Sequence, residues 1–170
     1  PYKVSGGQSF FDRAEIKDLC AWLRLWINED DDPAFLRAVT VPKRGIGHQT
    51  LASLGEFAGK ARLSLFGALF AHSLPAALPA RAIAGLHEFG RLLNDLRHRA
   101  GHTTGHEAAR SFLADWLKDI GYEQHLHDSA DSAPQASARW QNVLEFCDWM
   151  AGRCGGQIED AAGVTLRQEP

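Results

Sequence analysis

Residues 41–51 read Val-Pro-Lys-Arg-Gly-Ile-Gly-His-Gln-Thr-Leu, and this stretch decides how the middle of the chain folds. Gly45 and Gly47 can adopt backbone angles that are closed to other residues, which predicts a tight hairpin. Ile46 between them is expected to anchor the hairpin in the core. Apolar residues at helical spacing follow, so a helix is expected to begin near His48. The stretch therefore predicts a glycine hairpin that leads directly into a helix.

The same stretch has the chemistry of an anion site. Lys43 and Arg44 carry formal positive charge, and the unpaired N–H groups at a helix start favour an anion. A short helix is expected over residues 34–39, so the unit resembles the helix-hairpin-helix motif, which binds nucleic-acid backbone without reading sequence. The alternative is that the glycines only permit a tight turn and that the cations are solvated. The residues alone leave both interpretations open.

Length and composition predict one soluble globular domain. The chain has 170 residues, 45% of them hydrophobic, with five Trp and nine Phe to supply a core. The net charge of -3 means that any DNA contact should be local or part of a larger protein's grip. Three cysteines without C-x-x-C spacing are typical of a reducing compartment. No apolar run approaches the roughly 20 residues of a membrane span, and no leader segment is apparent.

Both ends of the chain alternate apolar and polar residues like short strands, over residues 2–4 and 164–168. Two isolated short strands could not pair stably by themselves. The chain also starts at Pro1 rather than Met. We therefore expect a piece of a longer polypeptide, in which this single domain over residues 1–170 interrupts a sheet of its host.

Between those ends the periodicity predicts an all-α domain. Helices are expected over residues 13–27, 34–39, 48–59, 64–71, 80–100, 107–120 and 138–153. Gly121 is the expected C-cap of the sixth helix. A polar loop is expected over residues 128–137, with His125 and His127 in a loop or short extended piece just before it.

Several possible catalytic or metal sites are present only in part. The acidic run 29–32 is expected to start a helix with Asp32 as N-cap, and a divalent-cation site is the alternative. His98, His102 and His106 are spaced by four, but the glycines between 101 and 105 should break the helix, so solvent-facing histidines are expected. No P-loop, G-x-S-x-G motif or nucleophile pair occurs. We expect no catalytic residue, bound metal or cofactor in this chain.

A longer resemblance begins near the N-terminus. Residues 5–18, Ser-Gly-Gly-Gln-Ser-Phe-Phe-Asp-Arg-Ala-Glu-Ile-Lys-Asp, resemble the G-G-x-x-F-F-x-R-x-E-I-K-D signature of the Rep, UvrD and PcrA helicases, which are superfamily 1 DNA motors. The resemblance continues through the hairpin and nearly the whole chain, and it is strongest to Rep, with UvrD as the alternative. Further matches are Asn28, Asp31, Asp32, residues 34–37, Thr50, Leu51, Arg139, Asn142 and Val143.

The resemblance implies that these segments form the 2B subdomain, a mostly helical module inserted into the second motor domain of an ATP-dependent 3'-5' DNA helicase. ATP and magnesium would be bound by the parent protein, outside this span. The module would contact duplex DNA near a junction with single strand and swivel to restrain unwinding in the cytoplasm of a bacterium, associated with the nucleoid. The implied DNA-binding residues are Lys43, Arg44, Gly45, Ile46, Gly47, His48 and Thr50. The implied hinge residues are Ser5, Gly6, Gly7, Thr165 and Leu166, within end segments at about 1–8 and 163–170.

Two further expectations concern the role of the early signature and the alternative function. Phe10 and Phe11 are predicted to be core residues, and Arg13 and Glu15 to lie in the first turn of a helix near the hinge, rather than to bind a ligand. The alternative function is a protein-interaction module, in which the helical surface and the loop at 128–137 dock a replication or repair protein and the hairpin is only structural.

Overall fold

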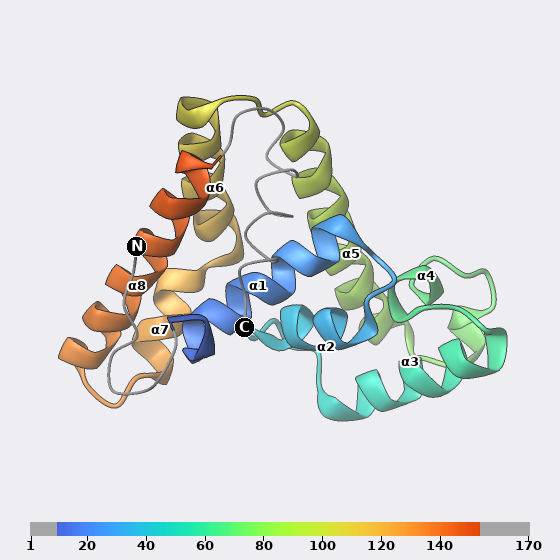
Figure 1. Ribbon diagram of the computed structural model, residues 1–170. Helices are drawn as coiled ribbons and strands as arrows, with labels where there is room; N and C mark the ends of the chain where they lie inside the picture. Colours follow the sequence, from blue (N-terminus) through green and yellow to red (C-terminus); the bar gives the residue numbers. More distant parts are fainter. Residues whose placement is uncertain (1–9, 154–170) are drawn as a thin grey trace.

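The regular secondary structure of the described part of the chain is helical throughout (Figure 1). The computed structural model describes residues 10–153, and within that range it contains helices and turns but no strand, which confirms the all-α prediction. The strand-like ends and the hinge residues lie outside the described range. The elements are η1 (Phe10–Asp12), α1 (Ala14–Ile27), α2 (Asp32–Thr40), α3 (His48–Ala61), α4 (Leu65–Ala68), η2 (Leu74–Ala76), α5 (Ala80–Gly101), α6 (His106–Ile120), α7 (Tyr122–Ser129) and α8 (Ala133–Gly152).

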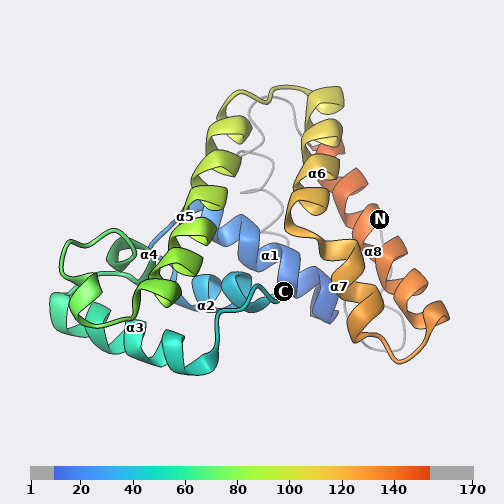
Figure 2. The ribbon, with the colours of Figure 1, turned by 180° about the vertical axis from the view of Figure 1, so that it is seen from behind.

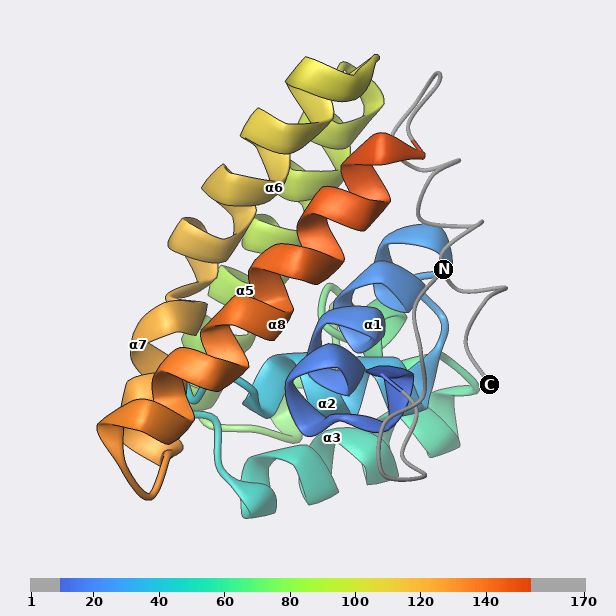
Figure 3. The same cartoon turned by 60° about the vertical axis from the view of Figure 1, so that its left-hand side comes forward.

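Helix α1 is the centre of the fold. Ten of its fourteen residues are buried, and it packs against α2, α5 and α8 (Figure 3). A helix that is apolar on most of its circumference is stable in water only when other elements cover it. Ile27, the last residue of the helix, is 46% exposed.

The other helices form two groups on either side of α1. Helices α2, α3 and α4 lie on one side, and α6, α7 and α8 lie on the other (Figures 1 and 2). Helix α5 reaches from the first group to the second, where it runs antiparallel to α6 (Figure 2). The connection between them ends at Gly105, whose φ of 93° is a left-handed value that favours glycine.

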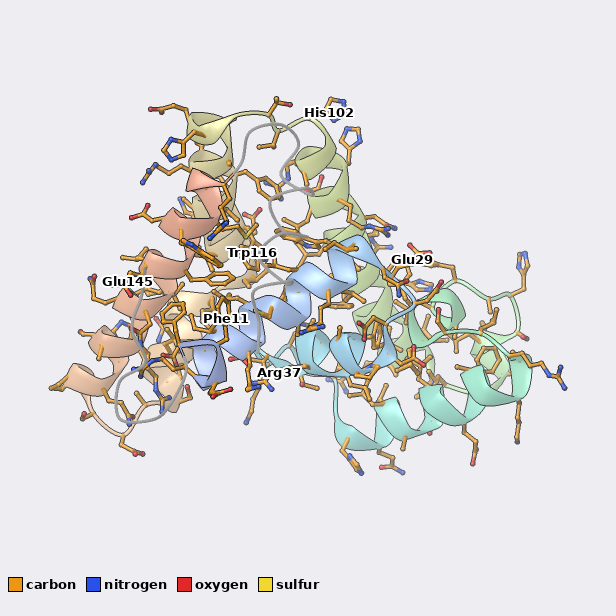
Figure 4. The ribbon with its side chains drawn as sticks, viewed as in Figure 1. Phe11, Glu29, Arg37, His102, Trp116 and Glu145 are labelled. Carbon is orange, nitrogen blue, oxygen red and sulfur yellow. The ribbon has the colours of Figure 1, made fainter. Side chains whose placement is uncertain are left out.

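Aromatic side chains fill the space between these groups. Trp22 and Phe35 both lie against Phe89 of α5, with ring centroids 5.5 Å apart in each case. Trp26 packs against Trp116 of α6 at 4.9 Å. Burial of one such side chain stabilises the fold by roughly 1.5–3 kcal/mol. Figure 4 shows Trp116 in the interior, where α1 meets α6.

Buried polar groups join α1 to three other helices. Asn142 of α8 donates a hydrogen bond to Glu15 at 2.8 Å. Tyr122 of α7 donates to Asp18 at 2.6 Å, and Arg37 of α2 donates to the other oxygen of the same carboxylate at 2.8 Å. Buried carboxylates persist only when they are paired in this way. The early sequence signature and the late match at Asn142 therefore meet in space.

The acidic run before α2 acts as a set of helix caps. Asp31, not Asp32 as predicted, is the N-cap of α2 and accepts a hydrogen bond from the Ala34 N–H at 3.0 Å. Asp32 instead accepts from the N–H of Leu65 at 2.9 Å, at the start of α4. The predicted N-cap was wrong by one residue, because the Asp32 side chain is occupied by its tertiary contact with Leu65.

Helix α7 is the element that the sequence prediction missed. His125 and His127 lie in this helix, and the loop predicted over 128–137 is short, because α8 begins at Ala133. Gly121 ends α6 with φ of 69°, as predicted, and the buried Tyr122 directly after it starts α7. Ser132 caps α8 by accepting from the Gln135 N–H at 3.2 Å, so the S-x-x-Q spacing was the signal available in the sequence.

Candidate nucleic-acid interface

Residues 41–47 form the connection between α2 and α3, and the two glycines differ in conformation. Gly45 has φ of 79°, the left-handed value that the sequence predicted. Gly47 is extended, with φ of -87° and ψ of 170°, so its backbone could accept another residue. No neighbouring side chain or backbone approaches within 4 Å of where a Cβ would stand on either glycine. The absence of side chains thus leaves this backbone open to a ligand.

Helix α1 holds this connection in place. The indole Nε1 of Trp22 donates a hydrogen bond to the Val41 carbonyl at 3.2 Å, and Pro42 is buried. Ile46 is half-buried against the core, as predicted, and its Cγ1 lies 3.7 Å from the position of a Cβ on Gly85 of α5. The loop is therefore anchored at its start and at its apolar tip, so a ligand would meet a preorganised backbone.

Arg44 points into the molecule. Its guanidinium carbon lies 5.6 Å from the ring centre of Trp22 and 5.4 Å from that of Phe89, at cation–π distance from both. Burial lowers the pKa of Arg44 below its ordinary value, and the nearby charge of Glu88 offsets part of that shift. In this conformation the guanidinium fastens the loop to α1 and α5, and it is not directed at solvent.

The residues that remain available to a ligand are those around the start of α3. Lys43 and His48 are exposed, and Thr50 is half-buried. Gly47 is the N-cap of α3 and supplies no side chain to the first N–H groups, which leaves them free to meet an anion. The structure thus brings an exposed cation, an open glycine backbone and a helix N-terminus together at one place.

The packing of α3 differs from a simple pair of helices joined by a hairpin. Helix α3 packs chiefly against α4, and α4 also contacts α2. The helix-hairpin-helix assignment remains a prediction, because it rests on the connection and the start of α3 rather than on close packing of α2 with α3.

Arg81 is a candidate that the sequence prediction missed. It is exposed in the first turn of α5, four residues before Gly85, which contacts Ile46 of the hairpin. Residues four apart lie on the same face of a helix, so Arg81 lies on the face that meets the hairpin. No local sequence pattern signals it, because 35 positions separate it from Ile46.

The three histidines spaced by four lie at the end of α5 and the start of α6. His98 and His102 have ring centroids 4.6 Å apart at the exposed end of α5, where Figure 4 shows His102 at the periphery. His106 begins α6 and is exposed. Among residues 10–153 no three His, Cys, Asp or Glu side chains gather in an arrangement that could hold a metal ion. In the same range no helix has the length and apolar character needed to cross a membrane.

The aromatic pair of the early signature is structural, as predicted for Phe11. Phe11, labelled in Figure 4, is 7% exposed, and its ring packs edge-on against Phe146 and Trp149 of α8. Phe10 is partly buried beside it. Together they attach the start of α1 to α8.

Comparison with known proteins adds the family. A model of the UvrD-like helicase C-terminal domain matches residues 1–151. The chain is 41% identical over 168 residues to the ATP-dependent DNA helicase Rep of Salmonella typhimurium, which covers 99% of this chain and 24% of that protein. It is 40% identical over 168 residues to Rep of Escherichia coli, with the same coverage, and 33% identical over 145 residues to PcrA of Bacillus subtilis, covering 85% of this chain and 19% of PcrA. The chain thus spans about a quarter of the length of its Rep relatives. It belongs to the UvrD-like helicase C-terminal domain family.

Proposed function

We propose that this chain is the 2B subdomain of a Rep-like DNA helicase and that it binds the backbone of duplex DNA near a junction with single strand. The observation that supports this best is the open backbone at Gly45 and Gly47, beside the uncapped start of α3 and the exposed Lys43. Backbone N–H groups and a cation bind phosphate without reading bases. The homologous proteins are named as DNA helicases.

The roles within the proposed site are unequal. Lys43 is exposed and supplies charge that can reach a phosphate, and His48 is exposed at the start of α3. Gly45, Gly47 and the N-terminus of α3 supply N–H groups, and Ile46 supplies the apolar anchor. Arg44 contributes through the loop conformation, because its guanidinium lies over two aromatic rings.

Binding by so few cations should be weak and sensitive to salt. The net charge of -3 gives no general attraction to DNA. Each phosphate that a cation neutralises makes log K fall by roughly 0.9 per unit of log salt concentration. The module would therefore position a duplex for motor domains elsewhere in the parent protein, where ATP and magnesium would act. Swivelling about its ends in the cytoplasm would restrain unwinding.

The first test is a fluorescence-anisotropy titration of this chain with a 20-base-pair duplex at low and moderate salt. Lys43→Gln is expected to weaken binding several-fold at low salt and to reduce the salt slope by about 0.9, since one phosphate contact is lost. Lys118→Gln removes the same charge from the exposed surface of α6 and serves as the matched control. Equal affinity of the two variants at both salts would exclude the hairpin as the contact.

The second candidate function is a protein-interaction module that docks a replication or repair protein, and the acidic balance of the chain favours it. This function predicts no salt-dependent DNA affinity and a partner footprint away from Lys43. Deleting the module from the parent helicase tests the regulatory role. Unchanged or faster unwinding would support a brake, whereas loss of ATP turnover would show that the motor requires the module.

A further inference from the structure

A cavity of about 350 Å³ lies where the first turn of α1 faces the first half of α8. Two arginines line it, Arg13 from the start of α1 and Arg139 from α8. Glu15, Gln135 and Asn142 are its other polar side chains. The cavity is separate from the hairpin, which contributes no residue to it.

Neither arginine has a partner for its charge within residues 10–153. The Arg13 Nε is buried and makes no hydrogen bond. Arg139 takes part in none of the hydrogen bonds or ion pairs of the described residues, whereas Arg37, Arg99 and Arg110 all pair with carboxylates. A buried N–H group without a partner costs free energy, so an acceptor that entered the cavity would relieve that cost for Arg13.

The charges in the cavity favour a single carboxylate. The Asn142 amide is already committed to the Glu15 carboxylate at 2.8 Å. Two guanidinium groups against that one carboxylate leave an excess of one positive charge. A planar guanidinium binds a carboxylate through two parallel hydrogen bonds, which suits an Asp or Glu side chain. A polyanion such as DNA would bring further negative charge toward Glu15.

We propose that this cavity receives an Asp or Glu side chain from a part of the parent helicase outside these 170 residues, and that the contact docks this module on the rest of the protein. The inference rests on the proposed function for the existence of that parent. About three quarters of each Rep relative lies outside the matched region.

Photo-crosslinking in the full-length parent helicase tests the occupant. The photoreactive residue p-benzoyl-phenylalanine replaces Ala138, an exposed residue at the cavity edge, and mass spectrometry identifies the captured peptide. The expected product joins position 138 to an acidic segment outside residues 1–170. The yield of this product should be at least fivefold lower in the Arg13→Gln, Arg139→Gln double variant. The same photoreactive residue at the exposed Ala108 of α6 should not capture that segment.

Four outcomes would overturn the proposal. They are the absence of any crosslinked product, a crosslink confined to residues 1–170, a crosslink to duplex DNA when DNA is added, and a crosslink yield that is unchanged in the double variant. Arg139→Lys keeps the positive charge but loses the two parallel N–H donors of the guanidinium. The crosslink yield of this variant should therefore fall between the yields of the parent and of Arg139→Gln. In this chain alone, Arg139→Gln should change Tm by less than about 2 °C, because no internal partner is lost. A larger decrease would make Arg139 a structural residue. Lys43→Gln should leave the crosslink unchanged, which separates this inference from the proposed DNA contact.

Discussion

At the scale of single residues, Arg44 and Lys43 show how neighbours in sequence can do different work. Both were expected to meet phosphate, and the DNA-binding role of each stays a prediction. Lys43 is exposed, whereas the Arg44 guanidinium lies over Trp22 and Phe89. The sequence around two adjacent cations does not show which of them packs into the core. That depends on the rings of Trp22 and Phe89, which lie 22 and 45 positions away from Arg44.

This difference predicts unequal effects of the two side chains on stability. Arg44→Ala is expected to lower the free energy of unfolding by about 1–2 kcal/mol, since it removes two cation–π contacts and the packing of the side-chain stem. Lys43→Ala should change it by less than about 0.5 kcal/mol, as for most exposed residues. Urea denaturation of both variants measures this. Equal losses would mean that Arg44 does not hold the loop.

The buried thiol of Cys20 predicts a dependence of stability on pH. Burial raises the pKa of Cys20 from 9.0 to about 11, with smaller opposing effects from nearby cations. The unfolded thiol therefore ionises first, so the stabilisation is complete below pH 9 and is lost as the pH rises from about 9 to about 11. The loss should reach about 2 kcal/mol near pH 10.5, at 1.36 kcal/mol per pKa unit.

The Cys20→Ala variant isolates this effect from other groups that titrate in the same range. Its free energy of unfolding, measured by urea denaturation at pH 8 and pH 10.5, should fall less between the two pH values than that of the parent chain. Identical decreases in both proteins would show that the thiol is free to ionise in the native state.

At the scale of elements, apolar periodicity predicted the existence and type of seven helices, because each of them buries one face. It failed for α7, whose eight residues include only two buried side chains, Tyr122 and Leu126. A helix that short shows little periodicity, and its position is decided by the Tyr122 contact with α1. The caps at Asp31 and Ser132 were readable in principle, but neighbouring acids and small residues offered equally good alternatives.

Glycines inside the helices allow a matched prediction. A Cβ on Gly55 of α3 would meet nothing within 4 Å, so Gly55→Ala should stabilise the protein by about 0.5–1 kcal/mol through helix propensity. A Cβ on Gly90 of α5 would stand 2.8 Å from the Phe70 ring. Gly90→Ala should therefore gain little or lose stability. Thermal unfolding followed by circular dichroism measures both, and equal gains would contradict the close contact of Phe70 with α5.

At the scale of the whole molecule, the buried polar groups of α1 connect the two helical groups. Asp18 binds Arg37 of α2 on one side and Tyr122 of α7 on the other. Burial, with the charge of Asp18 as the next cause, raises the pKa of Tyr122, so its hydroxyl stays protonated and donates. Asp18 thereby helps to fix α2 relative to α7 through α1.

Removing the Tyr122 hydroxyl should lower the stability of the whole fold. Tyr122→Phe keeps the ring but deprives the buried Asp18 of a donor, which should cost about 1–3 kcal/mol. Urea unfolding followed separately by tryptophan fluorescence and by circular dichroism should shift to the same lower midpoint with both probes. An unchanged midpoint would mean that water replaces the hydroxyl.

The sequence by itself determined the helical class, the placement of most helices, the left-handed turn at Gly45 and the family resemblance. These features depend on residues close together in the chain, where spacing and composition act directly. Only the tertiary structure decided that Arg44 turns inward, that Gly85 of α5 lies against Ile46 of the hairpin, and that Arg13 and Arg139 share a cavity. Those outcomes depend on which distant side chains pack together, and packing is set by the arrangement of all the helices at once.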